Sequence, residues 1–197
     1  MALRILGLHL VAKEVGILTK TGPCIIIANH QHLLDLFIFG SLFPPRTVTI
    51  GKKSLILIPI FGWAYWLAGN LLIDRKNSEK AKMKMQEAER LVIRKKLSIF
   101  ICPEGTRSHG KGLGPFKKGA FHLAVDSGLP LAPVVVSSYF GKTNFWRWRS
   151  GTVIVECLNP MMTKGLGPDA VAIVLEKAHA QMKVAIERLD RELSSDC

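Results

Sequence analysis

The stretch Cys24-Ile-Ile-Ile-Ala-Asn-His-Gln-His-Leu-Leu-Asp35 changes from apolar to polar part of the way along its length. Residues 24–28 are small or β-branched, which is typical of a buried strand. The polar residues 29–32 then end the strand, and Asp35 stands where the first turn of a helix would lie. A strand that passes through a polar loop into a helix is the repeating unit of an α/β fold.

Four other short β-branched runs are predicted to be strands, and they alternate with segments of helical length. The runs cover residues 47–50, 97–101, 132–137 and 152–157. The predicted helices cover residues 79–96, 118–127 and 169–193, where apolar residues recur at intervals of three and four. This order predicts an α/β fold with a mixed, mostly parallel sheet flanked by helices. No repeat or linker divides the chain, so residues 1–197 are interpreted as a single domain.

The composition is that of a folded, basic and rather apolar protein. Hydrophobic residues make up 48% of the 197, and the mean hydropathy is +0.23, which excludes a disordered tail, a collagen-like fibre and a coiled coil. Lys and Arg number 27 against 15 Asp and Glu, which gives a net charge of +12. Such a charge favours an anionic partner: nucleic acid, an acidic membrane surface or a phosphorylated substrate.

The cysteines and the first 20 residues indicate the cellular compartment of the protein. The four cysteines are widely spaced: Cys24, Cys102, Cys157 and Cys197. This spacing favours a reduced compartment, and a structural zinc site is not expected. In residues 1–20 we expect a short helix or strand. The apolar run there is too short and interrupted for a signal peptide or a membrane span, so the mature chain is expected to begin near Met1.

Residues 54–73 form a stretch of 20 residues without a charged side chain, and one helix of that length would cross a bilayer. Pro59 and Gly62 interrupt its first half, and the aromatic residues lie in its middle rather than at two interfaces. Lysine and arginine residues flank both ends, which would keep both ends on one side of a membrane. We therefore expect a membrane-associating segment with an apolar helix in the interface, the alternative being a helix buried in the core.

His30 and Asp35 are the first candidate catalytic pair. On a continuous helix they would lie about 140° apart around the axis and out of contact. If the helix begins after His30, the Asp35 carboxylate in its first turn can reach one imidazole nitrogen and leave the other free as a general base. A surface histidine followed by an aspartate at a helix start is the alternative interpretation. His30 and His32 lack the further ligands that a metal site would need, so no metal is expected.

A second candidate site follows the predicted strand at residues 97–101 and has the sequence Cys102-Pro-Glu-Gly-Thr-Arg-Ser108. Glu104, Thr106 and Arg107 would project from the carboxyl edge of the sheet, where open α/β sheets bind ligands, and an arginine offers a planar fork to a phosphate. A surface loop with a salt bridge is the alternative. Residues 105–111 also spell Gly-x-x-x-x-Gly-Lys, but Gly112 replaces the hydroxyl of a nucleotide-binding P-loop.

Two further blocks complete the set. Gly69-Asn-Leu-Leu-Ile-Asp-Arg75 places a basic residue directly after the apolar stretch. Leu129-Pro-Leu-Ala-Pro-Val-Val135 is an apolar segment framed by Pro130 and Pro133, suited to an acyl chain or to core packing. No Gly-x-Ser-x-Gly elbow is present and no cysteine precedes a plausible base, so an acceptor would have to attack an acyl donor directly.

Together, Asn-His-Gln-x-x-x-Asp, Gly-x-x-x-Ile-Asp-Arg, Pro-Glu-Gly-Thr-Arg-Ser and Leu-Pro-x-x-Pro-Val resemble the four motif blocks of the glycerolipid acyltransferases. The resemblance covers residues 22–193. Residues 47–54, 65–75 and 115–122 are more specifically similar to the bacterial 1-acyl-sn-glycerol-3-phosphate acyltransferases.

The resemblance implies transfer of a fatty acyl group from acyl-coenzyme A or acyl carrier protein to the 2-hydroxyl of lysophosphatidic acid, which forms phosphatidic acid. It implies no cofactor beyond this co-substrate, and a place on an anionic membrane surface at the cytoplasmic face of the bacterial inner membrane. It assigns the base and its orienting partner to the first block, the glycerol phosphate to the second and third, and the acyl donor or chain to the fourth. The residues so implied are His30 and Asp35; Arg75, Glu104, Gly105, Thr106 and Arg107; and Pro130 and Pro133.

Two alternatives stay open. A sibling transferase that acts on glycerol 3-phosphate or another lysolipid would use the same four blocks. A basic nucleic-acid-binding module is the distant alternative, because Phe145-Trp-Arg-Trp-Arg149 offers phosphate contacts and stacking faces. No nucleic-acid-binding signature accompanies that run, and the same alternation suits a membrane headgroup zone, so no nucleic-acid partner is expected.

Overall fold

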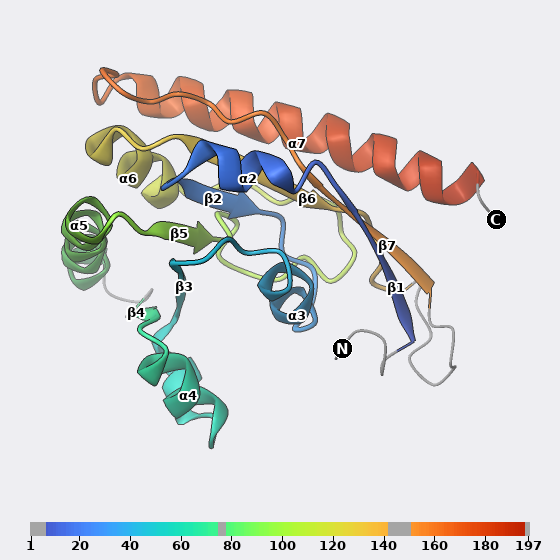
Figure 1. Cartoon of the computed structure of the whole chain (residues 1–197), viewed down its shortest axis with the longest axis horizontal. Helices are drawn as coiled ribbons and strands as arrows, with labels where there is room; N and C mark the ends of the chain where they lie inside the picture. Colours follow the sequence, from blue (N-terminus) through green and yellow to red (C-terminus); the bar gives the residue numbers. More distant parts are fainter. Residues whose placement is uncertain (1–6, 75–77, 142–150, 196–197) are drawn as a thin grey trace.

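A computed structural model describes residues 7–74, 78–141 and 151–195, and its centre is one seven-stranded sheet in the order β1-β7-β6-β2-β5-β3-β4 (Figure 1). The strands are β1 (Leu8–Lys13), β2 (Ile25–Ala28), β3 (Thr47–Lys52), β4 (Leu71–Ile73), β5 (Ser98–Ile101), β6 (Leu131–Val136) and β7 (Gly151–Cys157). The helices are α2 (Gly16–Thr21), α3 (Asp35–Gly40), α4 (Phe61–Leu67), α5 (Ser78–Lys95), α6 (Gly119–Ser127) and α7 (Ala170–Ser195), with a 3₁₀ helix η1 (Lys53–Leu57).

Five neighbouring strands, from β6 to β4, run parallel, and β2 is the middle strand of the whole sheet. It pairs parallel with β5 and β6, and β3 continues the parallel set from β5 to β4. β6 and β7 are antiparallel, while β1 pairs parallel with β7. The predicted α/β class with a mixed, mostly parallel sheet is thus confirmed. One consequence is that the loops after β2, β5, β3 and β4 all leave from the same edge of the sheet.

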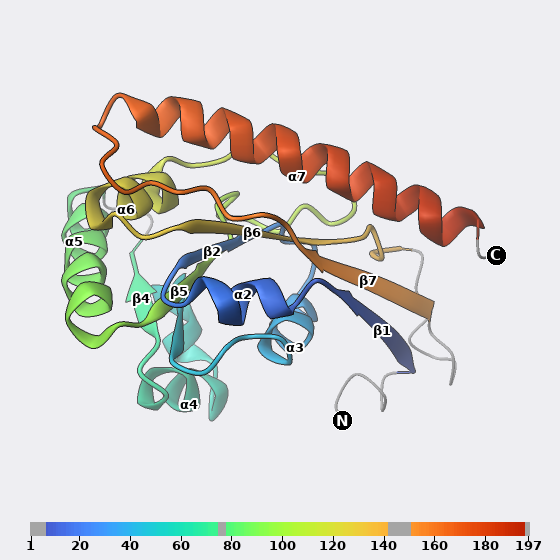
Figure 2. The same cartoon turned by 45° about the horizontal axis from the view of Figure 1, so that its top comes forward.

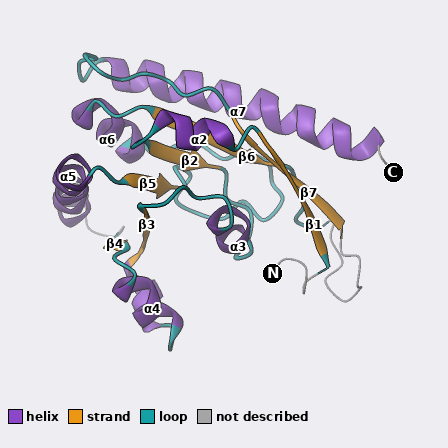
Figure 3. Ribbon diagram, in the orientation of Figure 1, coloured by secondary structure: helices purple, strands orange, loops and turns teal. Residues whose placement is uncertain are grey.

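Helices cover both faces of the sheet (Figure 3). In β2, Ile25 and Ile27 pack in the cluster that includes α5, α6 and α7, whereas Ile26 and Ala28 pack in the cluster that includes α2 and α3. Successive strand residues point to opposite faces, so a run that is apolar throughout is required at a strand covered on both sides. Figure 2 shows α7 lying lengthwise over β6 and β7.

The predicted helices and strands are all present, with bounds that differ by at most two residues. The 1–20 region contains β1 and α2. Neither β1 nor β4 was among the predicted strands, because each is short and has no run of β-branched residues long enough to mark it. α6 ends at Gly128, whose φ of 66° is left-handed and suits a glycine.

The apolar stretch 54–73 is not one helix but η1, α4 and β4 in succession. Its side chains from Leu57 to Leu67 are largely exposed: Leu57 79%, Ile60 83%, Trp63 68%, Trp66 60% and Leu67 75%. The core-helix alternative is therefore wrong for this segment. In Figure 1, α4 projects from the end of the sheet, away from the layer of α5, α6 and α7. Among the described residues no helix is long and apolar enough to cross a membrane.

Candidate functional site

His30 and Asp35 meet in the loop between β2 and α3. β2 ends at Ala28 and α3 begins at Asp35, so the five-residue separation is spanned by a loop and not by a helix. His30 Nδ1 lies 2.7 Å from Asp35 Oδ2. The Asp35 side chain is 2% exposed and that of His30 24%, so the imidazole reaches the surface while the carboxylate is enclosed. The contact predicted from the sequence is present.

The carboxylate of Asp35 also organises the loop around it. Oδ2 accepts the backbone N–H of Gln31 at 2.6 Å and that of His32 at 3.0 Å. Oδ1 accepts the hydroxyl of Tyr139 at 2.5 Å. A carboxylate that accepts from these donors also accepts from the imidazole, so Nδ1 carries the proton and Nε2 has its lone pair available. Nε2 has no hydrogen-bond partner among the described residues.

These contacts also decide what the backbone N–H groups before α3 can do. Free backbone N–H groups there would be suited to stabilise an oxyanion. The N–H groups of Gln31 and His32 are instead donated to Asp35. They hold the carboxylate beneath the imidazole and are not directed at a substrate.

Glu104 fixes the second predicted block against the first. Its Oε1 accepts the backbone N–H of His30 at 2.8 Å, and its Oε2 accepts that of Gly114 at 2.9 Å. Burial raises the pKa of the Glu104 carboxyl above its usual range, and the two backbone hydrogen bonds lower it in part. Glu104 is 6% exposed. Both carboxylate oxygens thus engage the protein's own backbone, and Glu104 braces the two loops.

Thr106 and Arg107 are exposed in the loop that follows β5. The next residue along, Ser108, donates its N–H to the His30 carbonyl at 2.8 Å, and this tethers the loop beside the imidazole. Gly105 has a φ of +71°, and a Cβ there would lie 3.0 Å from the Lys117 ammonium. Lys117 is therefore a second cation at this loop. Sequence reasoning gave it no role, although it lies in the predicted 115–122 resemblance.

The remaining predicted site residues lie elsewhere or outside the described residues. Arg75 and the run 145–149 lie outside them. Pro133 is buried within β6 and pairs with Ile27. The carbonyl of Pro130 accepts the N–H of Ile25, which places Pro130 at the edge opposite His30. The roles predicted for these prolines stay predictions.

Gln31 and Asn29 are polar residues whose function sequence reasoning missed. The Asn29 side chain exchanges two hydrogen bonds of 2.9 Å with the backbone of Val136. Gln31 donates to the Ser137 carbonyl at 2.9 Å and accepts the N–H of Tyr139 at 3.2 Å. Both are buried, and both tie the loop that carries His30 to the end of β6. A polar residue with no surface to face is the signal that could have found them.

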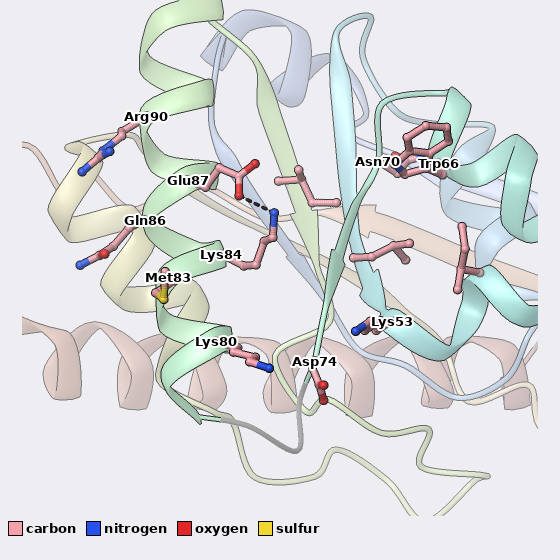
Figure 4. Close-up of a pocket in the computed structure, with 13 residues that line it drawn as sticks. Lys53, Trp66, Asn70, Asp74, Lys80, Met83, Lys84, Gln86, Glu87 and Arg90 are labelled. Atoms are coloured by element: carbon pink, nitrogen blue, oxygen red, sulfur yellow. Dashed lines mark hydrogen bonds and ion pairs between the residues drawn. The ribbon is translucent and has the colours of Figure 1, made fainter.

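A groove of about 1120 Å³ lies beside β4, the outermost strand of the sheet (Figure 4). Ile56, Trp66, Leu71 and Leu72 give it an apolar side, and the opposite side is the polar face of α5. Lys53 and Asp74, which directly follow β3 and β4, lie at its end, and Lys84 pairs with Glu87 in its wall. No catalytic residue predicted from the sequence lines it. Within the described residues no group of three or more possible metal ligands occurs.

Comparison with known proteins identifies the family of the chain. Residues 11–137 match the model of the acyltransferase family. The chain belongs to the acyltransferase family.

Individual curated relatives show a more specific similarity than the family match. The chain is 45% identical over 173 residues to the 1-acyl-sn-glycerol-3-phosphate acyltransferase of Escherichia coli, covering 88% of this chain and 71% of that protein. It is 44% identical over 170 residues to the protein of the same name from Haemophilus influenzae, covering 86% and 71%. The fold resembles the crystal structure of the lysophosphatidic acid acyltransferase PlsC from Thermotoga maritima, with a TM-score of 0.75, 24% identity and coverage of 93% and 73%.

Proposed function

We propose that the protein transfers a fatty acyl group from acyl-coenzyme A or acyl carrier protein to the 2-hydroxyl of lysophosphatidic acid, forming phosphatidic acid. The observation that carries the proposal is the 2.7 Å contact between His30 Nδ1 and Asp35 Oδ2, in a partly exposed imidazole with the Arg107 loop tethered next to it. The curated relatives at 44% and 45% identity support lysophosphatidic acid as the acceptor.

The reaction follows from the state of the imidazole. Nε2 of His30 removes the proton of the 2-hydroxyl while that oxygen attacks the thioester carbonyl carbon. Asp35 stabilises the imidazolium that forms. The carbon–sulfur bond then breaks, and the imidazolium returns the proton to the departing thiolate. The products are an ester and a free thiol, and the enzyme needs no cofactor or metal for this sequence.

The phosphate of the acceptor is held by the loop after β5 in this proposal. Arg107 presents a planar fork, Lys117 lies beside Gly105 as a point charge, and Thr106 offers a hydroxyl. Arg75 is proposed to add a further cation. Glu104 contributes through the backbone of His30 and Gly114, because its oxygens are already occupied.

Membrane association is proposed to use the exposed apolar surface formed by Leu57, Ile60, Trp63, Trp66 and Leu67, here called the η1–α4 surface. A contiguous exposed apolar patch of this kind is suited to a lipid interface. Trp66 also lines the groove beside β4, so the apolar side of that groove adjoins the η1–α4 surface. The net charge of +12 favours an anionic bilayer, which we place at the cytoplasmic face of a bacterial inner membrane.

The two alternative functions would require different features of the structure. A sibling transferase would share the dyad but prefer glycerol 3-phosphate or another lysolipid. A nucleic-acid-binding module would need the basic charge but neither the dyad nor the η1–α4 surface. The enclosed carboxylate beneath an imidazole therefore favours an enzyme.

The test is an acyl-transfer assay on the purified chain with anionic vesicles, both donor types and three acceptors: lysophosphatidic acid, glycerol 3-phosphate and lysophosphatidylcholine. Lipid mass identifies the product. We expect phosphatidic acid from lysophosphatidic acid, and a loss of about 10²- to 10⁴-fold in kcat for His30→Ala. Product from another acceptor alone would establish the sibling transferase. Turnover by His30→Ala near that of the unaltered chain would exclude the dyad mechanism.

A further inference from the structure

Tyr139 is the one donor to Asp35, among the described residues, that comes from a distant part of the chain. His30, Gln31 and His32 all lie within five residues of Asp35. Tyr139 is 104 residues away, in the segment that follows β6, and its hydroxyl donates to Oδ1 at 2.5 Å. The local donors all bond to Oδ2, so the phenol engages the opposite oxygen of the carboxylate.

The position of the phenol is strongly constrained. Tyr139 is 1% exposed and packs in the cluster that contains Ile38 and Phe39 of α3. Gln31 binds the backbone of the segment that carries Tyr139: its side chain accepts the Tyr139 N–H at 3.2 Å and donates to the Ser137 carbonyl at 2.9 Å. The segment that presents the hydroxyl is thereby attached to the loop that presents the imidazole.

The hydroxyl acts as a permanent donor. Burial raises the pKa of the Tyr139 phenol, and the charge of Asp35 raises it further. The phenol therefore does not exchange protons with the substrate, from which the carboxylate of Asp35 and the ring of His30 separate it.

We propose that Tyr139 is a positioning residue, which fixes the rotation of the Asp35 carboxylate and, by bonding Oδ1, sets the basicity of the His30 imidazole. A donor on Oδ1 draws negative charge away from Oδ2. Oδ2 then stabilises the imidazolium less than it would without the phenol. This inference rests on the proposed acyl transfer at the same site.

The test compares two hydroxyl deletions, because the chain contains only two tyrosines. Tyr139→Phe removes the donor to Asp35. Tyr65→Phe removes a hydroxyl that contacts Thr49 at 2.5 Å, on the far side of β3 from the dyad, and serves as the matched control. For Tyr139→Phe we expect kcat to fall about tenfold or more with KM for lysophosphatidic acid little changed. The acid limb of kcat/KM should move to higher pH, since the imidazole becomes more basic. Tyr65→Phe should leave that limb in place.

A double-mutant cycle separates positioning from simple structural support. With Asp35→Asn already present, Tyr139→Phe should cause little further loss of kcat, because the residue acts through the carboxylate. An equal loss in both backgrounds, or an unmoved acid limb, would overturn the inference. If the unaltered chain forms no phosphatidic acid the proposed function fails, and if His30→Ala keeps its turnover the dyad mechanism fails. An inactive His30→Ala with an unmoved limb in Tyr139→Phe rejects this inference alone.

A measurement without substrate covers the case in which Tyr139→Phe does not fold. In Tyr65→Phe, Tyr139 is the only tyrosine, and tyrosinate absorbance can be followed as pH rises. We expect no tyrosinate until the protein unfolds. Titration of the folded protein near the value of a free tyrosine, about pH 10, would overturn the inference.

Discussion

Glu104 and His30 are joined through the carboxylate of one and the backbone of the other, with Oε1 of Glu104 2.8 Å from the His30 nitrogen. The bond links the loops that follow β5 and β2, two neighbouring parallel strands. The loop that carries the phosphate-binding candidates is thus positioned relative to the imidazole by a buried carboxylate, independently of any substrate.

Glu104→Gln should destabilise the fold. An amide has one acceptor oxygen where the carboxylate has two, so its NH₂ group would face the N–H of either His30 or Gly114. We expect the free energy of unfolding to fall by about 1–3 kcal/mol, measured by denaturant titration. Glu87→Gln, which alters an exposed ion pair on α5, is the control and should change it by less than about 1 kcal/mol.

The pH dependence of stability gives a second reading of Glu104. The pKa of Glu104 in the folded state is raised above the ordinary value of 4.5. Between the unfolded-state pKa and the folded-state pKa, the folded protein therefore binds more protons than the unfolded chain. Stability contributed by this group therefore falls as pH rises through that window. Glu104→Gln should lack this slope. An identical slope in both proteins would contradict the assignment.

Arg107→Ala should weaken acceptor binding. The guanidinium is exposed beside the loop that Ser108 tethers to His30, so its loss removes a cation from the acceptor phosphate. We expect KM for lysophosphatidic acid to rise about tenfold or more, with Arg107→Lys intermediate and Lys117→Ala similar in direction. Steady-state kinetics on mixed micelles would measure this. Lys177→Ala, an exposed cation on α7, controls for the loss of one positive charge, and an equal rise there would contradict a local role.

Removing apolar groups from the η1–α4 surface should weaken membrane binding. Leu57→Ser with Leu67→Ser replaces two side chains that are 79% and 75% exposed, so the fold should be little affected. We expect binding to anionic vesicles, measured by sedimentation, to weaken about tenfold or more. The matched control is Ile173→Ser with Val184→Ser, 67% and 64% exposed on α7. Equal weakening by both pairs would exclude a dedicated surface. Tighter binding of the unaltered chain to an oligonucleotide at the same salt would favour nucleic acid as its partner.

Cys24 and Cys157 should resist alkylation while the protein is folded. Both are buried, and burial raises the pKa of the Cys157 thiol to about 12, with a smaller contribution from Glu156. The reactive thiolate is therefore scarce at neutral pH. We expect iodoacetamide to label both residues only in denaturant, as judged by mass spectrometry of the peptides. Labelling of the native protein at the rate of a free thiol would contradict the packing of the sheet that buries Cys24, next to β2, and Cys157, in β7.

Contacts of the site between residues close in sequence could be predicted, whereas contacts between distant residues could not. The His30–Asp35 contact could be predicted because both residues belong to one strand–loop–helix unit, whose local geometry brings them together. The brace from Glu104 could not, because its partner, the His30 backbone, lies 74 residues away along the chain. Only the pairing of β2 with β5 brings it to the His30 backbone. The apolar stretch 54–73 suited burial in protein and contact with lipid equally, until the positions of η1 and α4 left its side chains exposed.

By itself, the order of apolar runs determined the α/β class, the central strands and the long helices, because hydrophobic periodicity is a local property that each segment carries. The tertiary structure alone decided which polar groups share a hydrogen bond across many residues. Tyr139 reaches Asp35 because β6 lies beside β2 in the sheet, and Lys117 reaches Gly105 because the loop after β5 folds back on itself. Such contacts depend on strand order and loop path, which no single segment encodes.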